Sequence, residues 1–194
     1  AISDVLLNAE LSQAMELTPN ATRGKEIFNN LCSQCHGEDG WGSNDGEFPQ
    51  IAGQHRGVIV KQLVDIRSGY RDNPRMYLIT QESVIGGLQS IADVAAYIST
   101  LPMHPYPEVG EGSDLNHAEQ FYHRMCTECH GKQGEGDADK LYPLLHGQHY
   151  EYLLRQLLLI RDGNRKNANP EMTAIIQPMS DNELGAHWEF AEMS

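Results

Sequence analysis

"LCSQCHGEDG" (residues 31–40) returns with few changes as "MCTECHGKQG" (residues 125–134). Each copy carries a C-x-x-C-H motif. The motif residues are Cys32, Cys35 and His36 in the first copy and Cys126, Cys129 and His130 in the second. The two motifs contain all 4 cysteines of the chain, so none is left for a structural disulfide. The pair therefore indicates two sites of the same kind, one in each half of the sequence.

The similarity between the halves extends well beyond these motifs. It keeps an offset of 94 residues until a short loop, where the offset grows to 96. The further matched pairs are Pro49 and Pro143, "GQH" (53–55) and "GQH" (147–149), "KQLVDIRSG" (61–69) and "RQLLLIRDG" (155–163), and "NPRM" (73–76) and "NPEM" (169–172). An internal repeat of this length predicts two copies of one small domain.

A proline-rich segment separates the two copies. "PMHPYPEVGEGSD" (102–114) contains 3 prolines and 2 glycines, which suit an extended linker and would interrupt a helix. The predicted parts are an N-terminal extension (1–21), a first domain (22–101), the linker (102–114) and a second domain (115–194). Each domain is small for an independent core, so a bound cofactor would help to stabilise it.

Apolar residues recur at helical spacing in both copies. Ile59, Leu63 and Ile66 predict a helix that ends at Gly69, and residues 153–163 repeat the pattern. No stretch alternates between apolar and polar residues over a useful length, as a half-buried strand would. The sequence therefore predicts an all-α fold with long loops between short helices.

Two further helices are predicted from their capping residues. "SIADVAAYISTLP" (90–102) indicates a helix capped by Ser90, with Asp93 in the N3 position of a box-like start. Ser180 with Glu183 forms a capping box for the matching helix near the C-terminus. These helices would occupy the same place in the two domains.

Three kinds of site contain a C-x-x-C motif. A thioredoxin-like dithiol follows a strand in a βαβ unit, and no such pattern surrounds either copy. A zinc site would have to unite two cysteine pairs that lie in separate repeats, and it does not require His directly after each pair. A covalently attached haem c uses both thiols and the adjacent His, which reaches the iron. We therefore expect two covalently attached haem c groups.

The sixth ligand of each iron decides whether the haem is closed or open to substrates. Met76 and Met172 end the matched "NPRM" and "NPEM" segments, and their repetition favours them as ligands over core packing. His55 and His149 also recur, but they open the next helix, where surface or capping roles are expected. Other methionines, such as Met103 and Met179, have no repeat partner.

The composition narrows the functional classes. The formal net charge is −13, from 27 acidic and 14 basic side chains, which argues against nucleic acid as a partner. It favours a partner with a basic docking surface, and a generally acidic soluble protein is the equal alternative. No apolar run approaches the ~20 residues that a membrane-spanning helix needs, so no transmembrane segment is expected. The N-terminus lacks the features of an intact signal peptide, as it would after removal of one.

With these motifs, the chain resembles the class I c-type cytochromes, and specifically the two-domain dihaem family called cytochrome c4. The resemblance covers residues 22–194. It implies two tandem class I cytochrome c domains, each enclosing one covalently bound haem. The iron ligands that it implies are His36 and Met76 in the first domain and His130 and Met172 in the second.

The resemblance also implies contacts around the haems. The carbonyl oxygens of Pro49 and Pro143 would accept a hydrogen bond from the proximal histidine ring. Phe28 would face Tyr97 where the first and last helices of the domain cross, and Tyr122 would face Phe190 in the second domain.

These expectations lead to an electron carrier rather than an enzyme. A haem with His and Met ligands has no open iron position and suits outer-sphere electron transfer. The resemblance implies a periplasmic location in bacteria. We expect redox protein partners there, such as a membrane-bound oxidase or a quinol-oxidising complex. Two alternatives stay open: an electron-transfer subunit of a dehydrogenase complex, and a dihaem enzyme of the peroxidase type.

Overall fold

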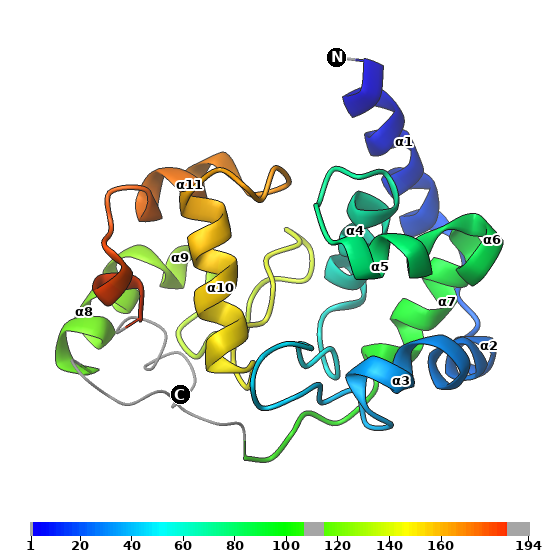
Figure 1. Ribbon diagram of the computed structural model, residues 1–194, viewed down its shortest axis with the longest axis horizontal. Coiled ribbons are helices and arrows are strands. Elements are labelled where there is room, and N and C mark those ends of the chain that lie inside the picture. Colours follow the sequence, from blue (N-terminus) through cyan, green and yellow to red (C-terminus); the bar gives the residue numbers. More distant parts are fainter. Residues whose placement is uncertain (1, 107–114, 186–194) are drawn as a thin grey trace.

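The computed structural model describes residues 2–106 and 115–185, which fold into two helical lobes side by side (Figure 1). The elements of the first lobe are α1 (Ile2–Glu16), α2 (Ala21–Ile27), the π-helical turn η1 (Phe28–Cys32), α3 (Ser33–His36), α4 (Arg56–Arg67), α5 (Pro74–Thr80), α6 (Glu82–Ile85) and α7 (Leu88–Ile98). The elements of the second lobe are α8 (Leu115–Met125), α9 (Thr127–His130), α10 (Tyr150–Arg161) and α11 (Pro170–Ile176). A further helical turn follows at residues 181–185.

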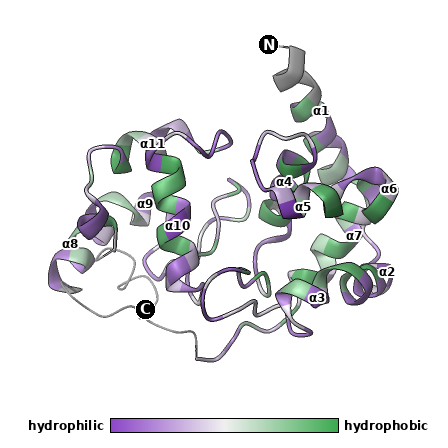
Figure 2. Ribbon diagram, in the orientation of Figure 1, coloured by the Kyte–Doolittle hydropathy of each residue, from purple (hydrophilic) through white to green (hydrophobic). Residues whose placement is uncertain are grey.

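The predicted all-α fold is confirmed. Within the described residues the only extended pairing is an isolated bridge between Asp137 and Tyr142. None of the helices in this part of the chain has the length and apolar character needed to cross a bilayer. In Figure 2 α7 is mostly hydrophobic, whereas hydrophobic and hydrophilic bands alternate along α10.

The ends of the matched helices follow from local chemistry. α4 and α10 each end before a glycine with positive φ, Gly69 at 75° and Gly163 at 73°, a conformation that other residues adopt at a cost. α5 and α11 each begin with proline after an asparagine cap. The Asn73 side chain accepts a hydrogen bond from the Met76 N–H, and the Asn169 side chain accepts one from the Glu171 N–H.

The start of α7 differs from the prediction. The helix begins at Leu88 after Gly87, so Ser90 lies inside it and does not cap it. Asp93 is fully buried and pairs with Arg23, and it also accepts a hydrogen bond from the Asn20 N–H at 2.7 Å. The carboxylate therefore joins α7 to the start of α2 instead of completing a local capping box. The predicted box of Ser180 and Glu183 is present, with Ser180 N–H 2.8 Å from the Glu183 carboxylate.

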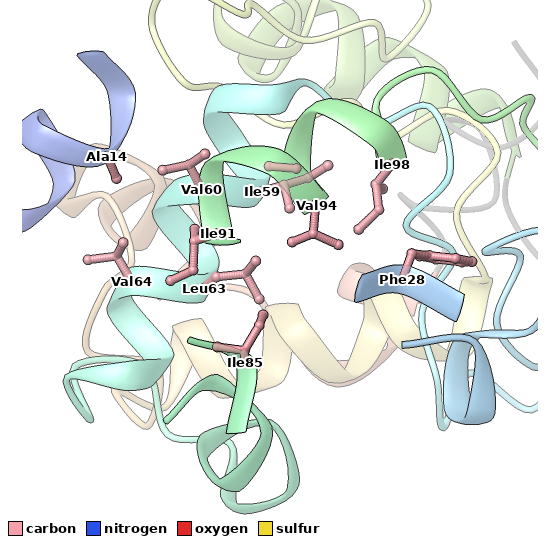
Figure 3. Packing of buried hydrophobic residues seen from close by; sticks show 11 residues of the cluster. Ala14, Phe28, Ile59, Val60, Leu63, Val64, Ile85, Ile91, Val94 and Ile98 are labelled. Atoms are coloured by element: carbon pink, nitrogen blue, oxygen red, sulfur yellow. The ribbon is translucent and has the colours of Figure 1, made fainter. Parts of the chain in front are cut away.

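Apolar side chains from α4 and α7 form the core of the first lobe (Figure 3). Val60, Val64 and Ile91 are fully buried there. The ring of Phe28 packs edge-on against Tyr97 with centroids 5.4 Å apart, as the family resemblance implied. In the second lobe Tyr122 is buried, but Phe190, its expected partner, lies outside the described residues.

The N-terminal extension contributes to this core. α1 packs on α4 and α7, and Ala14 is fully buried at the end of the cluster (Figure 3). Leu11 and Met15 pack beside it, and the Arg56 side chain donates a hydrogen bond to the Leu17 carbonyl at 3.2 Å. The second lobe has no such helix among its described elements.

Hydrogen bonds from the two "GQH" segments join the lobes. Gln54 bonds both the N–H and the carbonyl of Leu144 at 2.9 Å. Gln148 does the same to Gln50, accepting from its N–H at 2.9 Å and donating to its carbonyl at 2.7 Å. At the repeat offset of 94, Gln54 matches Gln148 and Gln50 matches Leu144. Exchanging the two lobes therefore converts one set of hydrogen bonds into the other. The interface is therefore pseudo-twofold.

The two repeated histidines belong to the same interface. The His55 ring bonds the Glu135 carbonyl at 2.8 Å, and the His149 ring bonds the Trp41 carbonyl at 2.5 Å. Both residues precede a helix, but neither side chain caps it. The expected capping role is thus wrong for both side chains, and the expected surface position is wrong for His149, which is buried; both rings link the lobes.

Candidate haem sites

The first C-x-x-C-H motif lies where the helix winding changes. η1 is a π-helical turn in which the Ser33 N–H donates to the Phe28 carbonyl, and α3 follows directly. Such turns are rare and often occur at functional sites. Cys32 lies at the end of this turn, Cys35 and His36 lie in α3, and all three residues line a large cavity.

The proximal histidine rings are held by the proline carbonyls that the resemblance implied. His36 is buried, and its Nδ1 lies 3.0 Å from the carbonyl oxygen of Pro49. His130 is buried in the same way, with Nδ1 3.2 Å from the carbonyl oxygen of Pro143. A carbonyl can only accept, so Nδ1 carries the proton and Nε2 keeps its lone pair. This tautomer suits an Nε2–iron bond.

Glycines that the sequence analysis did not interpret shape the loops that carry these prolines. Gly42 has φ 74°, and a Cβ there would lie 2.1 Å from the Phe48 carbonyl oxygen. Gly136 has φ 70°, and its Cβ would lie 2.5 Å from the Tyr142 carbonyl oxygen. The two glycines match at the offset of 94, a signal that could have identified them.

Burial sets the charge state of the motif residues. Desolvation lowers the pKa of His36 and of His130, so both rings are neutral near pH 7 and can act as ligands. Burial, and then the neighbouring cysteine, raises the pKa of Cys32 to about 12, and the pKa of Cys126 rises to about 12 for the same reasons. Redox-active dithiols have a lowered thiol pKa. These thiols are thus unsuited to a thioredoxin-like role.

The two repeated methionines line the same cavity as the motifs. Met76 on α5 and Met172 on α11 both line the cavity. Met125 and Met179 also line it, but neither recurs in the other repeat. The rival ligands His55 and His149 do not line it, because their rings are engaged at the interface.

The cavity fits two large, mostly apolar groups. Its volume is about 1920 Å³, above the roughly 300–1,000 Å³ of a typical small-molecule site. Both motifs open into it. Its apolar walls include Ile59, Leu63, Ile66, Ile85 and Val94 in the first lobe and Leu153, Leu157, Ile160, Ile176 and Leu184 in the second. Thiols, an imidazole with a free Nε2 and these apolar walls suit a covalently bound porphyrin in each lobe.

A shared zinc site does not fit the same residues. Within residues 2–106 and 115–185, no three His, Cys, Asp or Glu side chains come together as metal ligands. A structural zinc site needs four such ligands. The two cysteine pairs therefore serve separate sites.

Comparisons with known proteins agree with this arrangement. The sequence profile of the cytochrome c family matches residues 21–102 and again residues 116–193. Cytochrome c4 of Azotobacter vinelandii is 31% identical over 174 residues, which is 80% of either chain. A thiosulfate dehydrogenase electron acceptor of Stutzerimonas stutzeri is 35% identical over 172 residues, 82% of this chain and 76% of the relative.

A solved structure shares both the fold and the tandem organisation. The crystal structure of reduced recombinant cytochrome c4 from Pseudomonas stutzeri superposes with a TM-score of 0.75 at 27% identity. It covers 90% of this chain and 98% of the other. Each C-x-x-C-H motif thus attaches one haem c covalently, and the chain belongs to the cytochrome c4 family of dihaem electron-transfer cytochromes.

Proposed function

We propose that His36 and Met76 ligate the first haem iron and that His130 and Met172 ligate the second. The observation that carries this proposal is the cavity, which in each lobe is lined by the histidine of the motif and by the repeated methionine. Each bound haem supplies an iron that cycles between the ferric and ferrous states. The protein supplies the neutral imidazole, fixed in one tautomer by a proline carbonyl.

These ligands suit a carrier of electrons. Two occupied axial positions leave no site for substrate, and the thioether of methionine favours ferrous iron and raises its potential. Both repeats carry the same set, so neither haem is specialised as an open, peroxidase-type centre. Two such haems in one chain can hold two electrons or pass one along a short path.

The partner and the cellular location form part of the same proposal. The charge of −13 favours a redox protein whose docking surface is basic, since opposite charges speed encounter. We place the protein in the bacterial periplasm, between a donor such as a quinol-oxidising complex and an acceptor such as a membrane-bound oxidase. Membership of the cytochrome c4 family supports this placement.

Single methionine substitutions test the ligands. We expect Met76→Ala and Met172→Ala each to convert one haem from low spin to an open or misligated state, which absorption spectra and a redox titration would record. Met179→Ala is the matched control, because Met179 lines the cavity without a repeat partner. Unchanged spectra in both ligand variants, or an equal change in the control, would refute the assignment.

The second candidate function is that of an electron-accepting subunit in a dehydrogenase complex. The similarity to the thiosulfate dehydrogenase electron acceptor favours it. In that case we expect gentle purification to yield the chain bound to a catalytic subunit that reduces it. A chain that elutes alone under these conditions would leave the free carrier as the function.

A further inference from the structure

Two arginines and two glutamines form a closed ring where the lobes meet. Arg71 donates to Gln62 at 2.7 Å and to Gln156 of the other lobe at 3.1 Å. Arg165 donates to Gln156 at 3.0 Å and to Gln62 of the other lobe at 3.1 Å. The four residues match in pairs at the offset of 94. This arginine–glutamine ring therefore has the same pseudo-twofold symmetry as the interface.

The ring carries positive charge that no carboxylate neutralises by direct contact. Among the described residues, neither Arg71 nor Arg165 forms an ion pair within 4.0 Å, and the other acceptor of Arg71 is the hydroxyl of Tyr152 at 2.9 Å. The nearby Asp65 is buried and is bonded by Lys61 and by Asn167. Two guanidinium groups thus share neutral acceptors in a largely desolvated place, which favours a bound anion.

The pKa of Arg165 reflects its burial first and the charge of Arg71 second. Burial, and then the positive charge of Arg71, lowers the pKa of the Arg165 guanidinium to about 10. Arg71 itself is only 8% exposed. Two like charges held this closely repel each other unless a negative group lies between or beside them.

The ring also opens into the cavity that fits the haems. All four residues line it. The arginines lie in the loops that lead to the repeated methionines, Arg71 before Met76 and Arg165 before Met172. In Figure 1 the loop before α11, which carries Arg165, approaches the loop between α4 and α5, which carries Arg71. A haem c has two propionate carboxylates at the edge opposite its thioether bonds, and these are the only anions that the bound groups bring.

We propose that the arginine–glutamine ring binds a propionate from each haem, so that each arginine acts on both haems. The inference rests on the two attached haems and not on the identity of their sixth ligands. Positive charge beside a haem disfavours ferric iron, which carries one more positive charge than ferrous iron. Because each guanidinium spans both lobes, its removal lowers the reduction potential of both haems.

The test compares two single variants of the full-length, haem-loaded protein. Arg71→Gln and Arg165→Gln each remove one charge, and both potentials are measured by spectroelectrochemical titration, with each haem assigned from the NMR signals of its methyl groups. The matched control is Arg124→Gln, which removes an exposed arginine. We expect each ring variant to shift both potentials to more negative values, beyond any shift in the control.

Two other outcomes would overturn the proposal. A shift confined to the haem of the mutated lobe would show that each arginine serves its own haem alone. Shifts no larger than that of Arg124→Gln would show that the ring does not hold the propionates. Low-spin spectra in all variants would show that both axial ligands are still bound. The proposal for the arginine–glutamine ring can therefore fail while the proposal for the methionine ligands stands.

Two more variants separate charge from packing. Arg71→Lys keeps the charge but loses the forked donor of arginine. We expect both reduction potentials of this variant to lie between those of the wild type and those of Arg71→Gln. Gln62→Glu retains the shape of the side chain and offers the arginines a competing carboxylate, so we expect both potentials to fall. Unchanged potentials in a folded Gln62→Glu protein would also contradict the proposal.

Discussion

Gly42 shows how a single residue positions the first haem site. Its N–H donates to the His36 carbonyl at 2.8 Å, and its positive φ lets the chain turn back beneath the Phe48 carbonyl. The next residue after that carbonyl is Pro49, which holds the histidine ring. A residue with no side chain thus fixes the loop that orients the His36 ring, which we propose as an iron ligand.

We expect Gly42→Ala to destabilise the first lobe strongly. The left-handed conformation costs about 1–2 kcal/mol for a residue with a Cβ, and here the Cβ would also lie 2.1 Å from a backbone oxygen, which cannot move away as a side chain could. Denaturant unfolding of the haem-loaded protein, followed by haem absorbance, measures the loss.

The control for this prediction is Gly69→Ala. Gly69 has nearly the same φ, 75°, but nothing lies within 4 Å of the position that a methyl group would take there. The free energy of unfolding of Gly69→Ala should fall only by the conformational cost of about 1–2 kcal/mol. Equal losses in the two variants would show that the close approach at Gly42 has no consequence.

For single residues, the sequence predicts which side chains take part in a haem site better than it predicts which groups come into contact after folding. The cysteines and histidines stand out because the C-x-x-C-H motif is typical of haem attachment, and the proposed methionine ligands stand out because they recur. Gly42 and Gly136 recur as well, yet their role depends on which carbonyl comes close after folding. His55 and His149 illustrate the same limit, since their acceptors lie in the opposite lobe.

α1 is the element that most distinguishes the two lobes. Its apolar residues, Leu11 and Met15 among them, have a loosely helical spacing, which is compatible with docking on a partner or with fraying and does not predict packing on its own chain. The structure places it on α4 and α7, with Ala14 fully buried beside Val60 and Val64 (Figure 3). The helix thus covers apolar surface of α4 and extends the core of the first lobe.

Overpacking at Ala14 tests this contribution. We expect Ala14→Leu to cost about 1–3 kcal/mol, because a fully buried alanine leaves no space for three more carbon atoms. Gln13→Leu adds the same side chain at the neighbouring exposed position and should change stability by less than about 0.5 kcal/mol. Equal stability of the two variants in denaturant unfolding would mean that α1 does not pack on the core in solution.

The helix α7 shows why one element boundary was predicted wrongly. Ser90 and Asp93 have the spacing of a helix start, and local capping rules favour that interpretation. The Asp93 side chain instead bonds Arg23 and the backbone of Asn20, far away in the sequence. A buried tertiary partner thus replaced the local cap, whereas the exposed pair of Ser180 and Glu183 follows the rule.

At the scale of the whole molecule, hydrogen bonds rather than a continuous apolar core link the lobes. The glutamines of the "GQH" segments bond backbone groups of the opposite lobe, and the arginine–glutamine ring adds a second set. Because both sets obey the repeat offset, the interface uses the same residue types twice. The repeat predicts two similar domains, but it does not predict how they dock, because the sequence of either copy does not show which residues of the other copy it contacts.

Gln148 offers the sharpest test of this docking. Its buried amide bonds both backbone groups of Gln50, so Gln148→Ala should leave a buried N–H and carbonyl without partners, at about 1–3 kcal/mol for each group. We expect calorimetry to show the lobes unfolding in two separate transitions, with the haem spectra unchanged. Gln133→Ala, at an exposed position of the second lobe, should retain the wild-type profile. A wild-type profile for Gln148→Ala would instead mean that the linker and the remaining contacts suffice to hold the lobes together.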